Sequence, residues 1–465
     1  DRKNIFYIII LMKKIYLIIL MGFFLRFFGI HYSVGFLKNF NYGSLYPDEN
    51  VLVKTSLENK KGRIFLPYFF DQGPGYCNFL TVSIISIEKL GLIQEANREE
   101  KKYYKRMGRI FLYGRYLSCL AGTLSLLIYF LLIKRITDEN VAFISTLIFS
   151  ILPGHVIISH FIKSDVWMIL FVLLGLYAIS FKKFTLGFFI FGIATGFKYI
   201  SIFSILFSLL IFRTPIKLLY FLSFLLGLLL SSPQLIYKFP LFLEGIKYQY
   251  FLQSKPDPLY SKIKGFLWPE YGITFYYYLG PLICFILLFA FFWIIKNWKN
   301  FPWEIKGIIL SILFYCFFLG FTCGPLMRYL NLIAPFLSLI CASFIIDNKR
   351  NFLILPVIFI YTFLLSLKYD IKLTQEDPRE KANYWVIENV SKCSRIGYFN
   401  FRFWLPTIFW FNNPDYKLIN LENIKEFNKK VDFIFLNDLY LSKGYLKNFD
   451  FKDDCLLYTS PSPRD

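Results

Sequence analysis

The chain has 465 residues, of which 56% are hydrophobic and 21% aromatic, and it carries a formal net charge of +21. Many apolar runs reach about 18 residues, enough to cross a hydrocarbon layer of roughly 30 Å, and runs such as YFLSFLLGLLLSSPQLIY are apolar on every side, which excludes a water-soluble globular protein. Lys and Arg form short clusters between these runs and no continuous stripe, so the charge indicates basic cytoplasmic loops and excludes a nucleic-acid-binding surface.

The first predicted elements lie at the N-terminal end. Residues 1–11 are interpreted as upstream translation, because MKKIYLIILMGFFLRFFGI from Met12 reads as a natural start with two lysines ahead of a membrane helix. A weaker run at 77–93 is too short to cross the membrane, and we expect an interfacial helix there. The other apolar runs lie near residues 110–133, 140–158, 165–181, 184–212, 216–237, 274–296, 306–323, 328–346 and 351–367.

Basic residues between the apolar runs set the predicted topology. All of these clusters can be cytoplasmic only if 77–93 does not cross and if 184–212 forms two short helices broken near Lys198. The break also keeps Lys198 away from the bilayer centre, where a lysine costs about 2.5 to 3.5 kcal/mol or more. We therefore expect an all-α polytopic protein with about eleven transmembrane helices in the cytoplasmic membrane of a prokaryote, with its N-terminus inside and its C-terminus outside.

The topology also predicts the domain boundaries. Residues 12–367 form the transmembrane domain, in which the first outer loop covers 31–109 and carries interfacial helices. Residues 368–454 combine a helix near 380–390 with strands such as VDFIFLND, which predicts a small, truncated extracytoplasmic α/β domain. The final segment, CLLYTSPSPRD at 455–465, resembles the translation of a sequencing adapter, and we assign no chemistry to it.

Acidic residues from distant parts of the chain share the predicted outer side. Asp48 and Glu49 are adjacent in LYPDEN after the first crossing, and Asp165 opens the run DVWMILFVLLGLYA. Asp165 also suits the N-cap position of that helix, a role worth about 1 kcal/mol that does not exclude a functional one. The convergence of these carboxylates is the strongest signal of a site in the sequence.

Three cations accompany the carboxylates at the predicted outer face: Arg115, Lys198 and Arg328. For each of them, the alternative is a side chain that reaches from a helix end to the membrane interface. Together, cations and carboxylates beside the lipid headgroups suit the transfer of a sugar from a lipid phosphate. The cations would hold the phosphate leaving group, and a carboxylate would take the proton of the attacking hydroxyl.

The sequence predicts no certain cofactor. There is no GxxxxGK[ST] phosphate-binding loop, and the eight cysteines show no CxxC spacing. His155 and His160 lie five residues apart, too far for an HExxH face, and interfacial hydrogen bonding is the favoured role. A divalent metal held by His160 with Asp48 or Glu49 is the alternative, and a disulfide between Cys77 and Cys393 is compatible with the topology but unsupported.

Several motifs, taken in order, resemble the GT-C superfamily of membrane glycosyltransferases, most closely the protein O-mannosyltransferase and aminoarabinose transferase group. These are LYPDEN, GRYLSCLAGTLSLLIYFLLIKRI, SHFIKSDVWMILFVLLGLY, GFKYISIFSIL, RYLNLIAPFLSLICA and DPREKANYWVIENV, and they cover most of residues 12–400. Each is weak alone, and the ordered set is fairly specific. The region DQGPGYCNFL lacks the usual PPL-like start of the family's interfacial helix.

The resemblance implies roles for individual residues. Asp48 matches the position of the catalytic carboxylate, with Glu49 beside it, and Asp165 matches the second outer-loop acidic position. Arg115 matches the Arg that opens the second crossing, and Lys198 a recurrent basic position assigned to the donor phosphate.

We therefore expect an inverting glycosyltransferase that moves a hexose or pentose from a polyprenyl-phosphate carrier to an acceptor hydroxyl on the outer face. In this hypothesis Asp48 is the general base, Asp165 positions the acceptor or a metal, and Arg115 and Lys198 hold the donor phosphate. Glu49, His160 and Arg328 are further candidate contacts. The acceptor is a protein, lipid or polysaccharide. The alternative is a polytopic transporter or lipid flippase, although such proteins place ionisable residues near the midplane and often show two similar halves.

Overall fold

The computed structural model describes residues 2–32, 34, 44, 46–61, 70, 73–93, 101–254, 268–321, 327–347, 351–398, 416–420, 431–437 and 456–459. The chain divides into two compact units. Unit 1 contains residues 1–30, 51–94 and 112–370, and unit 2 contains 31–50, 95–111 and 371–465. Three helices cross the sequence boundaries between the units: α2 (Pro47–Lys60), α4 (Lys101–Ile136) and α17 (Leu355–Lys372).

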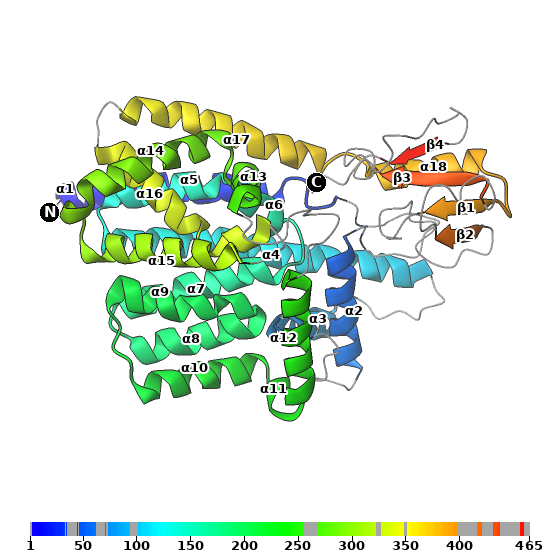
Figure 1. Ribbon diagram of the computed structural model, residues 1–465, viewed down its shortest axis with the longest axis horizontal. Coiled ribbons are helices and arrows are strands. Elements are labelled where there is room, and N and C mark those ends of the chain that lie inside the picture. Colours follow the sequence, from blue (N-terminus) through cyan, green and yellow to red (C-terminus); the bar gives the residue numbers. More distant parts are fainter. Residues whose placement is uncertain are drawn as a thin grey trace. The chain divides into compact units, whose positions relative to one another are not determined.

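Unit 1 is helical in its described residues (Figure 1). Its longer helices are α1 (Arg2–Phe27), α3 (Gly75–Lys89), α5 (Glu139–Ser150), α7 (Ser164–Ser180), α8 (Phe184–Phe197), α9 (Phe203–Phe212), α10 (Leu218–Ser231), α12 (Phe239–Ser254), α13 (Trp268–Leu279), α14 (Pro281–Asn297), α15 (Trp303–Leu319) and α16 (Ala334–Asp347). Shorter elements are α6 (Pro153–Ser159), α11 (Gln234–Tyr237), η1 (Tyr199–Ile202), η2 (Trp298–Asn300), η3 (Met327–Leu332) and η4 (Asn351–Ile354).

Helices α7, α8 and α10 lie side by side in unit 1 (Figure 1). Glycines allow α8 and α10 to approach closely: a Cβ atom on Gly192 would lie 2.0 Å from the carbonyl oxygen of Phe224, and one on Gly227 would lie 2.0 Å from that of Phe189. Small residues at helix contacts are typical of packing inside membranes, where close van der Waals contact replaces the hydrophobic driving force.

The predicted break in the apolar run 184–212 is confirmed. Helix α8 ends at Phe197, Lys198 has an extended backbone conformation (φ −156°, ψ 120°), and η1 and α9 follow. The weaker run at 77–93 coincides largely with α3. The segment just before α3 packs against the end of α8, because a Cβ atom on Gly73 would lie 2.1 Å from the carbonyl oxygen of Gly196. The interfacial position of α3 stays a prediction.

Among the described residues, two helical segments are long and apolar enough to cross a membrane, Arg106–Ile136 and Pro281–Asn300. A third crossing follows if α5 and α6, bent by 60°, act as one span, and further apolar helices of 10–17 residues surround them. These spans support a multi-pass membrane protein. The number of about eleven crossings and their orientation remain predictions from the positive-inside rule.

Unit 2 contains helix α18 (Pro378–Asn389) and a parallel four-stranded sheet with the strand order β2-β1-β3-β4. The strands are β1 (Arg395–Tyr398), β2 (Lys417–Asn420), β3 (Phe433–Asn437) and β4 (Leu456–Thr459). Helix α18 and strand β3 match the elements expected near 380–390 and in VDFIFLND. Strand β4 lies in the segment that was interpreted as adapter translation, and it pairs with β3 over four residues.

Asp377 joins the start of α18 to the segment after α1. Its Oδ1 accepts the backbone N–H of Arg379 at 2.8 Å, and its carboxylate pairs with the Arg379 guanidinium at 2.7 Å. The hydroxyl of Tyr32 donates to Asp377 Oδ2 at 2.7 Å. Burial raises the pKa of Asp377, but the hydrogen bonds from Arg379 and Tyr32 favour the charged form more strongly and leave the pKa below its ordinary value.

This depressed pKa predicts an acid-sensitive α18. A carboxyl group with a lowered folded-state pKa stabilises the fold above its unfolded pKa of about 3.9, and that contribution is lost as the pH falls through the folded-state value. We expect Asp377→Asn to reduce the protection of the Arg379 amide by about 3 kcal/mol at neutral pH and to flatten its pH dependence in the acid range. Hydrogen exchange measures both, and equal slopes in the two proteins would contradict the assignment.

Candidate active site

The centre of the candidate site is a buried ion pair between Asp165 and Lys198. The Lys198 ammonium donates to Asp165 Oδ1. Asp165 is 0% exposed and Lys198 is 7% exposed. Asp165 lies in the first turn of α7, and Lys198 lies in the break between α8 and η1. The break therefore places Lys198 inside unit 1, in contact with a carboxylate, and the interface-reaching alternative does not describe its side chain.

One prediction about Asp165 is wrong. The N-cap position of α7 is occupied by Lys163, and no side chain caps that end. Asp165 is already within the helix, and its carboxylate instead accepts a hydrogen bond from Lys198. Its second oxygen, Oδ2, has no hydrogen-bond partner among the described residues.

Two more cations act on the pair. The charges of Arg328 and Lys163 both act on Asp165, in addition to Lys198, which contacts it. The Tyr329 ring lies 5.9 Å from both the Lys198 ammonium and the Arg328 guanidinium carbon. Sequence reasoning missed Lys163, which is 3% exposed. The available signal was its position two residues before Asp165, at the end of the connection between α6 and α7.

Arg115 is fully buried in α4. Its Nη1 donates to the carbonyl oxygen of Ile30 at 2.8 Å, and its guanidinium carbon lies 5.2 Å from the centre of the Phe161 ring. Ile30 lies three residues beyond the end of α1, so this bond ties α4 to the connection that follows α1. The structure thus gives Arg115 a partner at the start of the first predicted outer loop.

His160 belongs to a separate buried cluster. Its Nε2 lies 2.7 Å from the Phe28 carbonyl oxygen and its Nδ1 lies 2.9 Å from that of Val156. Asp370 Oδ1 is 3.6 Å from Nε2. In the same cluster, Arg26 Nη2 donates to His155 Nδ1 at 2.8 Å. Both histidines therefore act as hydrogen-bonding groups, as the sequence favoured.

Asp48 and Glu49 belong to unit 2, in the first turn of α2. Asp48 is partly exposed, whereas Glu49 is fully buried and accepts a hydrogen bond from the Ser44 hydroxyl. Asp165 and the cations belong to unit 1. The convergence of Asp48 with Asp165 stays a prediction.

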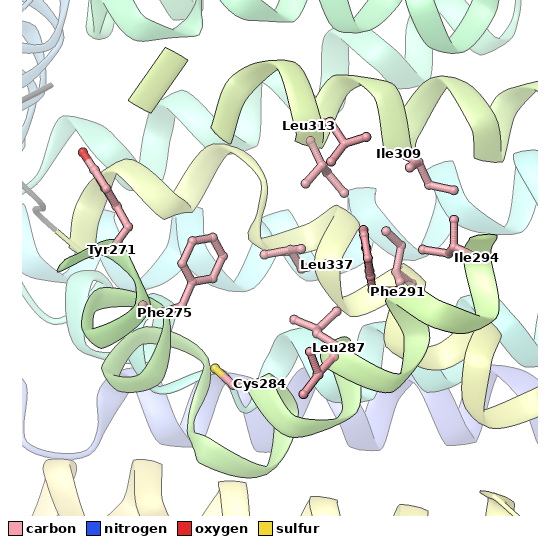
Figure 2. A pocket seen from close by; sticks show the side chains of 13 residues that line it. Tyr271, Phe275, Cys284, Leu287, Phe291, Ile294, Ile309, Leu313 and Leu337 are labelled. Carbon is pink, nitrogen blue, oxygen red and sulfur yellow. The ribbon is translucent and has the colours of Figure 1, made fainter. Parts of the chain in front are cut away.

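A cavity of about 430 Å³ lies among α13, α14, α15 and α16 in unit 1 (Figure 2). This volume falls within the range of small-molecule sites. It is open at the surface, where Leu313 and Phe291 are 51% and 49% exposed, and Tyr271 is buried at the other side. The side chains labelled in Figure 2 carry only two heteroatoms, the Tyr271 hydroxyl and the Cys284 sulfur.

The cavity is linked to the ion pair through α15. Leu313 of α15 lines the cavity, and Tyr315, two residues further, donates its hydroxyl to the carbonyl oxygen of Tyr329 at 2.7 Å. The Tyr329 ring in turn neighbours Lys198. Helix α15 thus contacts the cavity through Leu313 and, through Tyr315, the Tyr329 residue that neighbours Lys198.

The described residues do not fit a resident metal ion. In that part of the chain, no group of three His, Cys, Asp or Glu side chains could hold one. The fully buried Glu49 is engaged with Ser44, and both ring nitrogens of His160 face backbone carbonyl oxygens. Cys77 and Cys393 are both free thiols, so the disulfide alternative is not realised.

Comparison with known proteins identifies the fold. No family model matches the chain, and no curated protein matches its sequence. ArnT from Cupriavidus metallidurans, solved with bound undecaprenyl phosphate, matches with a TM-score of 0.56 at 12% identity over 91% of this chain and 87% of ArnT. The oligosaccharyltransferase of Archaeoglobus fulgidus, solved with a tethered acceptor peptide, matches with a TM-score of 0.54 at 10% identity over 89% of this chain.

This chain spans 64% of the length of the archaeal oligosaccharyltransferase. At these identities the similarity establishes the fold alone, which this chain shares with ArnT and with the archaeal oligosaccharyltransferase.

Proposed function

We propose that the protein is an inverting glycosyltransferase that transfers a sugar from a polyprenyl phosphate to an acceptor hydroxyl at the outer face of the cytoplasmic membrane. The observation that carries the proposal is the buried Asp165–Lys198 pair, on which the charges of Arg328 and Lys163 also act, together with the apolar cavity among α13 to α16. A phosphate group needs the cations, and a lipid tail needs an apolar surface. The GT-C fold, which ArnT solved with undecaprenyl phosphate shares, agrees with this assignment.

The proposed roles follow from the contacts of each side chain. Lys198, with Arg328 and Lys163 near it, holds the donor phosphate, and Asp165 keeps the Lys198 ammonium in place. Arg115 of α4 is proposed to contribute to the same phosphate site, as the matching family position implies. The partly exposed Asp48 is the general base.

In the reaction, the acceptor oxygen attacks the anomeric carbon while the carbon–oxygen bond to the phosphate breaks. Asp48 takes the hydroxyl proton, and the polyprenyl phosphate leaves with the bonding electron pair, stabilised by the cations. A single displacement of this kind inverts the anomeric configuration. The donor already carries its activated leaving group, so the step requires no nucleotide.

The direct test uses the full chain reconstituted in liposomes with a panel of radiolabelled sugars linked to polyprenyl phosphate. An enzyme releases polyprenyl phosphate and transfers or hydrolyses the sugar. A transporter or flippase moves the intact donor between leaflets without releasing its phosphate. Translocation of intact donor in the absence of any bond cleavage would replace the proposed function with the transporter alternative.

The cavity makes a prediction about lipid-tail length. Leu313→Trp replaces an aliphatic side chain at the cavity mouth by a large indole ring. We expect this variant to raise the KM for long polyprenyl donors about tenfold and to leave the KM for a short-chain donor nearly unchanged. Phe317→Trp is the matched control, because Phe317 lies on the same helix at 55% exposure and does not line the cavity. Steady-state kinetics with donors of two chain lengths measures the difference. Equal KM changes for both donors would show that the cavity does not bind the lipid tail.

A further inference from the structure

Glu49 differs from its acidic neighbour in its surroundings. It is fully buried, and the Ser44 hydroxyl donates to its Oε2. The adjacent Asp48 is partly exposed in the same first turn of α2. The hydrogen bond from the Ser44 hydroxyl fixes one oxygen of this buried carboxylate in place.

Ser44 connects three groups around the start of α2. Besides donating to Glu49, its Oγ accepts the backbone N–H of Tyr46 at 3.0 Å, and its carbonyl oxygen accepts from the Asn50 side-chain amide. The N–H of Glu49 donates to the carbonyl oxygen of Tyr46 at 3.1 Å. Together, Ser44, Tyr46, Glu49 and Asn50 form a connected set of hydrogen bonds, which we call the Ser44 box, and Asp48 lies within its span.

The Ser44 box is tied to the rest of unit 2. Ser44 pairs with Val34 in an isolated antiparallel bridge. Tyr32, two residues before Val34, donates its hydroxyl to the buried Asp377 at 2.7 Å. The backbone that precedes Asp48 is therefore anchored at Tyr32 and at Ser44, which limits the conformations that the first turn of α2 can adopt.

We propose that Glu49 is a positioning residue that orients Asp48 through Ser44 and does not itself contact donor, acceptor or metal. The assignment rests on the proposed function, in which Asp48 is the general base. Displacement of a general base by about 1 Å can lower the rate up to 100-fold without weakening substrate binding. Loss of the box should therefore lower kcat and leave the KM for the donor unchanged.

The first experiment is a double-mutant cycle of Ser44→Ala and Glu49→Ala in the reconstituted full chain. We expect each single variant to lower kcat by roughly 10- to 100-fold with an unchanged donor KM, and the double variant to be no worse than either one. Glu49→Gln keeps an oxygen that accepts from Ser44 and is expected to retain most of the activity. Ser56→Ala removes a buried hydroxyl from the same helix outside the box and is the matched control.

Other outcomes overturn the assignment. If Glu49 contacts the donor or a metal directly, Glu49→Gln will be as inactive as Glu49→Ala, the KM will rise, and the two losses in the cycle will add. Hydrogen exchange of the peptide covering residues 44–50 gives a readout independent of turnover. Exchange unchanged in Ser44→Ala and Glu49→Ala would disprove the box itself. If the two variants exchange faster but the wild-type chain shows no turnover, the Ser44 box is present and the proposed function is refuted.

Discussion

Asp48→Asn abolishes most sugar transfer while the protein stays folded in the membrane: this is the largest effect that we expect on activity. Asparagine has the shape of aspartate but cannot accept the proton of the attacking hydroxyl, so the expected loss is about 10² to 10⁴-fold in kcat. Asp48 is partly exposed, and the amide of asparagine fits the space of the carboxylate. Release of polyprenyl phosphate from a labelled donor measures the rate.

The matched control is Glu58→Gln, which removes one carboxylate from the same helix α2 about three turns further along. We expect it to retain the wild-type rate. An equal loss in both variants would instead indicate a general effect of the lost negative charge on α2. The pH profile adds a second check, because removal of the general base should remove the acid limb of the kcat profile. Normal turnover by Asp48→Asn would exclude Asp48 as the base.

The second large effect concerns the Asp165–Lys198 pair, and here stability and activity should separate. Removal of one partner from a buried pair costs about 3 to 5 kcal/mol, because the other charge remains without compensation. We therefore expect Asp165→Leu and Lys198→Met each to lower the unfolding midpoint in detergent markedly. The double variant, which removes both charges, should recover more than half of the lost stability.

Activity should not recover with stability. If Lys198 holds the donor phosphate, the double variant stays inactive or shows a strongly raised KM, although it is folded. If the pair is purely structural, the double variant regains both properties. Lys134→Met is the control for a surface pair, since Lys134 and Glu139 form an exposed contact at 2.7 Å that is worth at most about 1 kcal/mol.

Several elements were accessible from the sequence because they depend on local composition. The apolar runs predicted the helices, and the position of Lys198 within a run of 29 residues predicted the break, since a lysine is excluded from the bilayer centre. A helical pattern near 380–390 and the strand-like run VDFIFLND predicted α18 and β3. The number of crossings does not follow from hydropathy alone, because several of the described apolar helices are shorter than a full span.

The candidate site was only partly accessible. Sequence order singled out Asp165 and Lys198, but the N-cap role expected for Asp165 was wrong, and Lys163 was overlooked. The division of labour between Asp48 and Glu49 was invisible, because two adjacent carboxylates carry the same local signal. Burial differentiates them, and burial depends on residues such as Ser44 that no pattern connects to Glu49.

The sequence by itself determined that this is a multi-pass membrane protein, where its helices are interrupted, and which charged residues flank its apolar runs. Those properties follow from hydropathy and charge along the chain, which each segment carries with it. Only the tertiary structure decided that Lys198 meets Asp165, 33 residues away, and that Arg115 meets the carbonyl oxygen of Ile30 in the connection that follows α1. Such pairs are selected by how distant helices pack, because a buried charge must find its partner wherever the packing places one.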